Sequence, residues 1–415
     1  VTVSRSYSLP IGVRQNNTIT FTLSEASSTF TAADITVTGG SIGSLTTVSS
    51  TVYRVSFTPT ADTASGTATL SVDGAKFTDA AGNDNTASNT LSIPFDTREP
   101  TVAITRAGST SLRSGQTDII TFTLSEASNT FIASDITVTG GSIGALTTTS
   151  STVYSVVFTP VTNTQSGTGS ISVAAGRFTD ATGNGNIASS TRSVPYDTLA
   201  ATISNVNSST ANGTLGIGSS VSIQITFSEA VTISGMPQLT LETGATDRTA
   251  SYASGSGTST LTFTYTVQSG DTSGDLDYAS ASALALNGGS ILDSVGNTAI
   301  LTLPTPGTSG SLGANMAILV ASEPTQIVSV RTPAGTASGA AFTTQPRVSL
   351  QDNGGSIVTS DNTTVVTATV GTGAALVGTR TATAVNGVVT FDNLGISGTA
   401  GTAYTITYSA TVNGN

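Results

Sequence analysis

The strongest constraint on the fold is a repeat of about one hundred residues. The motif FTLSEAS occupies residues 21–27 and returns unchanged at residues 122–128, a spacing of 101 residues, and FTDAAGN at 77–83 returns as FTDATGN at 178–184. Solenoid and propeller repeats run only about 20 to 50 residues, so a period this long corresponds to a whole domain. We therefore expect a series of separate domains, an arrangement that spans distance or presents a surface and rarely builds one catalytic pocket.

Within each repeat the apolar pattern predicts β-strands. Every second residue is apolar from Ile19 to Leu23, and the same alternation recurs at residues 53–57, 68–72 and 91–95, with glycines at turn positions between the runs. A period of two is the signature of a half-buried strand, and no convincing helical period is present. About seven short strands in about 100 residues predict an all-β, two-sheet immunoglobulin-like sandwich. The chain has no cysteine or tryptophan, so the disulfide and buried tryptophan of antibody domains are absent.

We expect four such sandwiches arranged end to end. The predicted domains are residues 1–97, its repeat 98–198, a longer variant 199–322 and a divergent sandwich of a second subtype 323–415.

Details of the later repeats refine this division. In the second copy either Ile119 or Ile120 begins the apolar series of the first long strand. The third segment adds a Gly/Ser-rich hairpin near residues 254–259, and the fourth has an Asn386-Gly387 hairpin turn. The short linker at residues 96–100 runs directly into a strand, so neighbouring domains should be nearly collinear.

Composition restricts the possible ligands. The chain has 24 acidic and 13 basic residues, too few cations to neutralise a row of phosphates, which argues against nucleic acid and favours divalent cations. The absence of histidine and cysteine excludes zinc and copper sites, histidine-based triads and thiol nucleophiles. No apolar run approaches the 18 residues of a membrane helix, so we expect no membrane insertion here, and we expect any secretion signal or anchor to have been removed or to lie outside this sequence.

Several motifs carry a family resemblance. FTLSEAS followed by ADITV, the TDAAGN segment and the D-T-x-x-P linker resemble the bacterial Ig-like repeats of large secreted adhesins and biofilm-associated surface proteins, over about residues 1–322. Residues 343–352 and 385–394 are similar to another repeat type of large bacterial surface proteins. The resemblance implies an extracellular or cell-surface location, with cell-surface or matrix components, or copies of the chain itself, as partners.

Two equivalent sets of oxygen-bearing side chains are the candidate metal ligands. They are Glu25, Asp79, Asn83 and Asp96 in the first module, and Glu126, Asp180, Asn184 and Asp197 in the second. Calcium takes six to eight oxygen ligands, and a strand end, a turn and a linker can meet at a domain junction. Adhesin-type relatives bind Ca²⁺ at such junctions, so the resemblance implies that calcium stiffens a rod here.

The alternative is structural, because Asp-x-x-Gly-Asn is also an ordinary turn and Glu25 can simply solvate a strand end. In the third module Ala321 stands where a linker aspartate is expected, with Glu323 as a possible substitute. The spaced residues Asp271, Asp275 and Asp277 lack the glutamate of an EF-hand, so we expect a solvated loop.

No acidic pair stands apart from the repeat pattern, so we expect no catalysis. The sequence instead predicts a non-catalytic extracellular structural or adhesive rod, the stalk of a bacterial surface adhesin. The alternative is a self-assembling surface-layer or filament subunit, built from the same sandwiches through exposed sheet edges.

Overall fold

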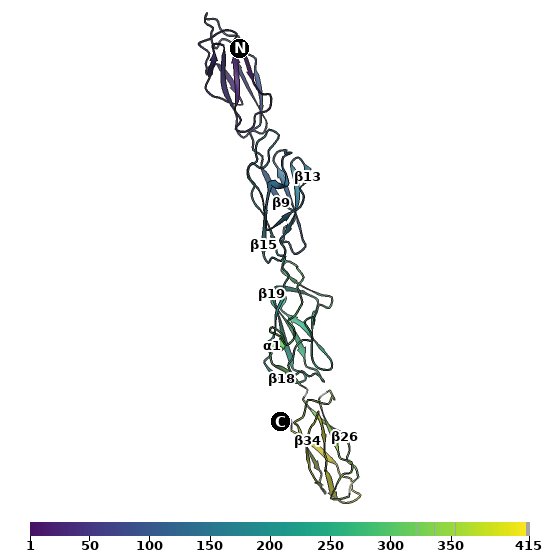
Figure 1. Ribbon diagram of the computed structural model, residues 1–415. Coiled ribbons are helices and arrows are strands. Elements are labelled where there is room, and N and C mark those ends of the chain that lie inside the picture. The colour runs from purple at the N-terminus through teal and green to yellow at the C-terminus, as the bar shows by residue number, and fades with distance from the viewer. Residues whose placement is uncertain (322, 336, 353, 412–415) are drawn as a thin grey trace. The chain divides into compact units, whose positions relative to one another are not determined.

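A computed structural model describes residues 1–321, 323–335, 337–352 and 354–411. The described chain is nearly all β and divides into two compact units, Val1–Leu199 and Ala200–Asn415. Each unit contains two separate hydrophobic cores, each surrounded by its own strands (Figure 1). The predicted boundary at 322/323 falls on Ser322 and the predicted end of the fourth domain on Asn415, both outside the described residues.

The first sandwich packs a five-stranded sheet, in the order β1-β2-β6-β4 with β5 also on β6, against the three-stranded sheet β3-β7-β8. Its elements are β1 (Thr2–Arg5), β2 (Asn17–Thr22), the 3₁₀ turn η1 (Ala32–Asp34), β3 (Ile35–Thr38), β4 (Gly40–Ile42), β5 (Thr46–Ser49), β6 (Val52–Pro59), β7 (Gly66–Val72) and β8 (Leu91–Phe95). Ile19 opposes Val55 and Phe21 opposes Tyr53 in the antiparallel β2–β6 pair. All four side chains are buried, as the alternation predicts.

The second sandwich repeats this arrangement. Its elements are β9 (Val102–Arg106), β10 (Asp118–Leu124), η2 (Ala133–Asp135), β11 (Ile136–Thr139), β12 (Gly141–Ile143), β13 (Thr147–Ser150), β14 (Val153–Pro160), β15 (Gly167–Val173) and β16 (Arg192–Tyr196). The sheets are β9-β10-β14-β12, with β13 also on β14, and β11-β15-β16. Of the two candidate core isoleucines, Ile120 is fully buried and Ile119 is 51% exposed.

An aromatic cluster fills the interior of each repeat. Phe131 lies 5.5 Å from Phe122, 5.1 Å from Tyr154 and 5.2 Å from Phe178, measured between ring centroids. Such pairs contribute about 0.5 to 1.5 kcal/mol each beyond their buried area. The Tyr154 hydroxyl donates to the carbonyl of Ser128 at 2.6 Å, so its burial leaves no unsatisfied donor.

In the second unit the third sandwich is built around the long strand β19, which pairs with β17, β22 and β24. Its elements are β17 (Ile203–Ser208), β18 (Gly213–Leu215), β19 (Ser220–Ser234), β20 (Gln238–Leu241), β21 (Arg248–Ser254), β22 (Thr258–Thr266), β23 (Leu284–Ala285), β24 (Ser290–Asp293), the short helix α1 (Leu312–Asn315) and β25 (Ile318–Val320). β21 and β22 form an antiparallel hairpin, which confirms the hairpin predicted near residues 254–259.

The predicted solvated loop is wrong for Asp271, whose side chain is 1% exposed. Its carboxylate accepts hydrogen bonds from the Tyr265 hydroxyl at 2.6 Å and from Arg248 Nε at 2.8 Å. The Arg248 charge and these donors replace the water that a buried carboxylate loses, so burial is tolerated. Burial and the Asp271 carboxylate raise the pKa of Tyr265, which therefore remains a neutral donor.

The fourth sandwich consists of three three-stranded sheets, β26-β28-β32, β27-β33-β30 and β31-β29-β34. Its strands are β26 (Gln326–Arg331), β27 (Ala340–Ala341), β28 (Arg347–Gln351), β29 (Val365–Val370), β30 (Ala374–Val377), β31 (Thr381–Thr383), β32 (Val388–Thr390), β33 (Gly395–Gly398) and β34 (Ile406–Ala410). Asn386 and Gly387, at φ +50° and +70°, turn the chain between the bridged residues Val385 and Val388. The predicted hairpin turn is therefore confirmed, with positive φ at both central residues as a type I′ turn requires. Among the described residues, none of the helices is long and apolar enough to cross a membrane.

Candidate metal centre in the first unit

The Asp-x-x-Gly-Asn motif forms the same turn in both repeats. Asp180 Oδ1 accepts the backbone N–H groups of Thr182 at 2.8 Å and Asn184 at 2.9 Å, and Asn184 Nδ2 donates to Asp180 Oδ2 at 2.7 Å. In the first repeat, Asp79 and Asn83 make the corresponding bonds. The motif therefore forms the ordinary aspartate turn that the sequence analysis gave as the structural alternative. It fixes one carboxylate at one pole of each sandwich.

Three carboxylates meet where the first sandwich joins the second. Oxygen atoms of Asp96, Glu126 and Asp180 all lie within 4.8 Å of one another. Asp96 begins the linker after β8, Glu126 follows β10, and Asp180 belongs to the turn described above. The centre thus takes its acidic residues from the end of one repeat and the beginning of the next.

The predicted grouping of four ligands within one module is wrong. Glu25 follows β2, whose end lies beside the start of β6, whereas Thr97, next to Asp96, bonds to Thr60 after the end of β6. Antiparallel strands end at opposite poles, so Asp96 lies at the pole of the first sandwich opposite Glu25, Asp79 and Asn83.

The same displacement applies to Asp197. Its neighbour Thr198 donates to the carbonyl of Val161, just after β14, so Asp197 lies at the pole opposite Glu126, Asp180 and Asn184. The Asp197 backbone N–H donates to Leu112 at 2.8 Å, and its Oδ1 accepts from Leu199 at 3.1 Å.

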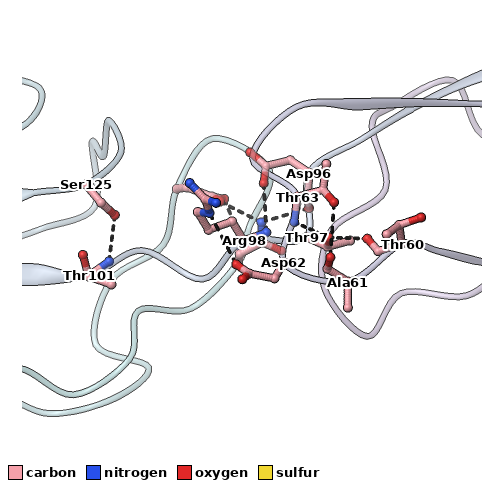
Figure 2. A network of polar contacts seen from close by, with 11 residues as sticks. Thr60, Ala61, Asp62, Thr63, Asp96, Thr97, Arg98, Thr101 and Ser125 are labelled. Atoms are coloured by element: carbon pink, nitrogen blue, oxygen red, sulfur yellow. Dashed lines mark hydrogen bonds and ion pairs between the residues drawn. The ribbon is translucent and has the colours of Figure 1, made fainter. Parts of the chain in front are cut away.

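The linker that carries Asp96 is held on both sides by hydroxyl groups (Figure 2). The Thr97 hydroxyl donates to Thr60 at 2.6 Å and accepts the backbone N–H of Thr63 at 3.1 Å. At the other end the Thr101 N–H donates to Ser125 Oγ at 2.9 Å. Asp96 Oδ1 itself accepts the backbone N–H of Arg98 at 3.1 Å, so the carboxylate is also held in place at the start of the linker.

Asn184 links the two sandwiches directly. Its Nδ2 donates to the carbonyl oxygen of Asp96 at 3.0 Å, and its Oδ1 accepts the N–H of Val13 in the first sandwich. Asn184 is 1% exposed, whereas the equivalent Asn83 is exposed. A Cβ added to Gly12 would approach Asn184 Oδ1 to 2.9 Å, so this close contact requires glycine at position 12.

The electrostatics of the cluster are unfavourable without a cation. Burial, followed by the Asp96 and Asp180 charges, raises the pKa of Glu126, while Arg98 opposes the shift. Glu126 Oε1 is buried and has no hydrogen-bond partner. A buried carboxylate oxygen without a donor carries a desolvation cost that a bound cation would remove.

The donor set fits a hard divalent cation. Three carboxylates from Asp96, Glu126 and Asp180 supply the oxygen chemistry that Ca²⁺ binds, with water completing the six to eight ligands. The cluster contains no sulfur or imidazole nitrogen, so its chemistry does not favour zinc or copper.

The other predicted ligands lie on a separate surface. Glu25, Asp79 and Asn83 line a pocket of about 220 Å³ at the opposite pole of the first sandwich, together with Val1. The Asn83 amide donates to Asp79 Oδ2 at 2.9 Å, and the bonds from Asn83 hold the pKa of Asp79 below its usual range.

One polar junction residue was missed by the sequence analysis. Asp352, fully buried, accepts the backbone N–H groups of Gly354 and Ser356, and the Ser269 hydroxyl of the third sandwich donates to its Oδ2 at 2.8 Å. Burial alone would raise its pKa, but the bonds from Ser269, Ser356 and Gly354 outweigh burial and lower it. The signal was Asp352-Asn-Gly-Gly, an aspartate turn with different spacing from the repeated motif.

Replacement of Asn184 tests how much the direct link contributes. Asn184→Ala removes the partners of Val13 N–H and Asp96 C=O, and we expect a loss of about 2 to 3 kcal/mol in local stability. The matched control Asn83→Ala removes the same intra-turn bond without an inter-sandwich partner and should cost about 1 kcal/mol. Hydrogen exchange at Val13 and the linker amides measures the difference, and equal losses in both variants would contradict the link.

The fold and the polar junction define the class of protein: a tandem array of immunoglobulin-like β-sandwiches. Residues 1–95 and 96–198, which contain the first two sandwiches, each match the family described as bacterial Ig-like domain. No curated protein sequence matches the chain.

Solved structures with similar folds include tandem immunoglobulin domains. The I-band fragment I67–I69 of titin is 9% identical, with 71% of this chain and 94% of that chain covered at a TM-score of 0.33. A marsupial T cell receptor is 11% identical, with 76% and 97% covered at 0.28. InvD of Yersinia pseudotuberculosis is 14% identical, with 76% and 85% covered at 0.22.

Proposed function

We propose that this chain is a non-catalytic, extracellular structural or adhesive segment of a bacterial surface protein, and that Ca²⁺ at Asp96, Glu126 and Asp180 braces its first junction. The match of the first two sandwiches to the bacterial Ig-like family supports the structural or adhesive role. The observation that supports calcium at the junction is that the three carboxylates come from two sandwiches. Asp96 belongs to one sandwich, and Glu126 and Asp180 belong to the next.

The physical role of the cation follows from this division. Without it, three carboxylates repel one another across the junction, and their repulsion favours separation of the two sandwiches. A bound cation reverses the sign of this interaction and adds ligand bonds that exist only while the sandwiches remain together. Calcium would therefore restrict bending at the linker, so that the repeats act as a spacer of defined reach.

Calcium removal from the full chain tests the proposal. We expect wild-type protein to bind calcium at a site that Asp96→Asn eliminates, and chelation to broaden the distribution of lengths measured by X-ray scattering and to lower the melting temperature of the first unit. Asp79→Asn changes the equivalent turn carboxylate at the opposite pole of the first sandwich and should leave calcium binding at the Asp96 site unchanged. If chelation leaves the melting temperature and the distribution of lengths unchanged, calcium does not stiffen this junction.

The same scattering experiment separates the spacer from a self-assembling subunit. A spacer remains monomeric as protein concentration rises in calcium, whereas a surface-layer or filament subunit grows into larger particles. Growth of larger particles with protein concentration would contradict the spacer role and favour a self-assembling subunit.

A further inference from the structure

The third and fourth sandwiches meet within the second unit at a polar junction of their own. We infer that this junction is a cation-independent latch, in which the turn at residues 268–271 of the third sandwich binds the Asp352 carboxylate of the fourth. Asp271 is the positioning residue of the latch, because it holds that turn in shape. The inference does not depend on calcium at Asp96, so either one can fail without the other.

Hydrogen-bond donors occupy both oxygens of the fully buried Asp352 carboxylate. Oδ1 accepts the backbone N–H groups of Gly354 at 2.9 Å and Ser356 at 3.0 Å, and Oδ2 accepts the Ser269 hydroxyl at 2.8 Å. The Gly270 backbone donates a further bond. A carboxylate has about four lone-pair sites, so these donors satisfy it without a cation. The calcium cluster differs, because one of its buried carboxylate oxygens has no donor.

The turn that supplies Ser269 and Gly270 is fixed from inside the third sandwich. The Gln268 N–H donates to Asp271 Oδ2 at 2.8 Å, and the Asp271 N–H donates to the Gln268 carbonyl at 3.2 Å. The arginine and tyrosine contacts described above hold Asp271 itself. Gly270 lies at φ +85°, the left-handed conformation that the third residue of a type II turn requires. The buried aspartate thus presents a hydroxyl and an N–H group to the fourth sandwich.

Glycine at position 354 allows the two sandwiches to approach this closely. A Cβ there would lie 2.3 Å from Ser269 Oγ and 2.6 Å from Ser269 Cβ. Non-bonded carbon atoms are most stable at about 3.5 to 4.0 Å, so a side chain at this position would displace the turn. The Gln326 amide donates to the Asp352 carbonyl at 3.0 Å, so the fourth sandwich also holds its side of the latch in place.

The charges of the latch are stabilised without a shared cation. Within the described ranges, neither Asp271 nor Asp352 belongs to a set of three carboxylates whose oxygens lie within 4.8 Å of one another. Asp271 is paired with Arg248, and hydroxyl and N–H donors stabilise the charge of Asp352. We therefore expect chelation to leave this junction unchanged.

Spin labels measure the latch in the full chain. Because the chain has no cysteine, Thr264→Cys and Thr383→Cys place one label at an exposed strand position of each sandwich. Electron spin resonance should give a narrow distribution of distances between the labels, in calcium and in chelator alike. Gly354→Ala should broaden this distribution in both buffers. Gly371→Ala is the matched control, because neither glycine has positive φ and a Cβ at 371 meets nothing within 4 Å.

Hydrogen exchange tests the positioning role of Asp271. Ser269→Ala and Asp271→Asn should each raise exchange of the Gly270 amide about tenfold or more, since each removes support from a bond to a charged group. Asp361→Asn changes an aspartate of the fourth sandwich whose bonds are local, to Thr363 and Thr364, and should leave Gly270 unchanged.

Exchange in β19 and β22 shows whether the third sandwich remains folded in each variant. Ser269→Ala retains the buried ion pair of Asp271, so it decides the inference even if Asp271→Asn unfolds that sandwich. A wide distribution of distances in the wild type, a response to chelation, or equal broadening by Gly354→Ala and Gly371→Ala would overturn the latch. Unchanged Gly270 exchange in a folded Asp271→Asn variant would remove the positioning role.

Discussion

Asp118→Asn should destabilise the second sandwich by about 3 to 5 kcal/mol, the cost of leaving a buried charge without its partner. Arg106 Nε lies 2.6 Å from Asp118 Oδ2, and the two side chains are only 3% and 4% exposed. Asp118 Oδ1 also accepts the N–H of Gly108 at 3.0 Å. The amide of the variant has one acceptor oxygen in place of two and no negative charge, so the Arg106 guanidinium loses the interaction that makes its burial tolerable.

The first sandwich provides the reciprocal experiment. Arg5 and Asn17 occupy the positions of Arg106 and Asp118, Arg5 Nη1 is buried without a partner, and burial lowers the pKa of Arg5. Asn17→Asp should therefore stabilise the first sandwich by about 1 to 2 kcal/mol by supplying the missing carboxylate.

The effects have to be measured within each sandwich, because a chain with four cores need not unfold in one step. Hydrogen exchange of β9 and β10 reports on Asp118→Asn, and exchange of β1 and β2 reports on Asn17→Asp. A neutral result for Asp118→Asn, or destabilisation by Asn17→Asp, would show that this pair does not control the stability of the repeat.

Much of the strand structure could be predicted from the sequence alone. Alternating apolar residues predicted the strands and most of the buried side chains, because burial of one face of a strand is a local property. The alternation could not decide between the adjacent residues Ile119 and Ile120, because either one continues the apolar series. The pairing of Ile120 with Val156 on the core side of β14 decides between them.

The candidate metal ligands were predicted by residue type but not by grouping. The repeat identified the oxygen-bearing residues, yet it assigned Asp96 to its own module, whereas the fold brings it to Glu126 and Asp180. Following the strand directions would have separated these residues. Glu25 follows β2, whereas Asp96 lies near the end of β6, which runs antiparallel to β2. The burial of Asp271 had no such local signal, since it depends on Arg248, 23 residues away.

The dependence of junction stability on pH should reverse its sign when calcium is added. Without calcium, the pKa of Glu126 in the folded protein lies above the ordinary value of 4.5. The folded state therefore retains a proton that the unfolded state has already released, and the contribution of Glu126 to the unfolding free energy falls as pH rises above 4.5. With calcium, ligation requires ionised carboxylates, so binding releases protons and stability rises with pH.

The variant Glu126→Gln isolates this effect, because it removes the titrating group and retains a side chain of similar size. We expect the wild-type minus variant difference in unfolding free energy to fall with increasing pH in calcium-free buffer and to rise in calcium. At a free calcium concentration about 1,000 times the dissociation constant, binding contributes about 4 kcal/mol, most of which the variant should lose. Hydrogen exchange of the linker amides between about pH 4.5 and pH 7 measures both slopes. Slopes of the same sign in the two buffers would contradict a calcium site at this cluster, since proton release on metal binding is a necessary consequence of carboxylate ligation.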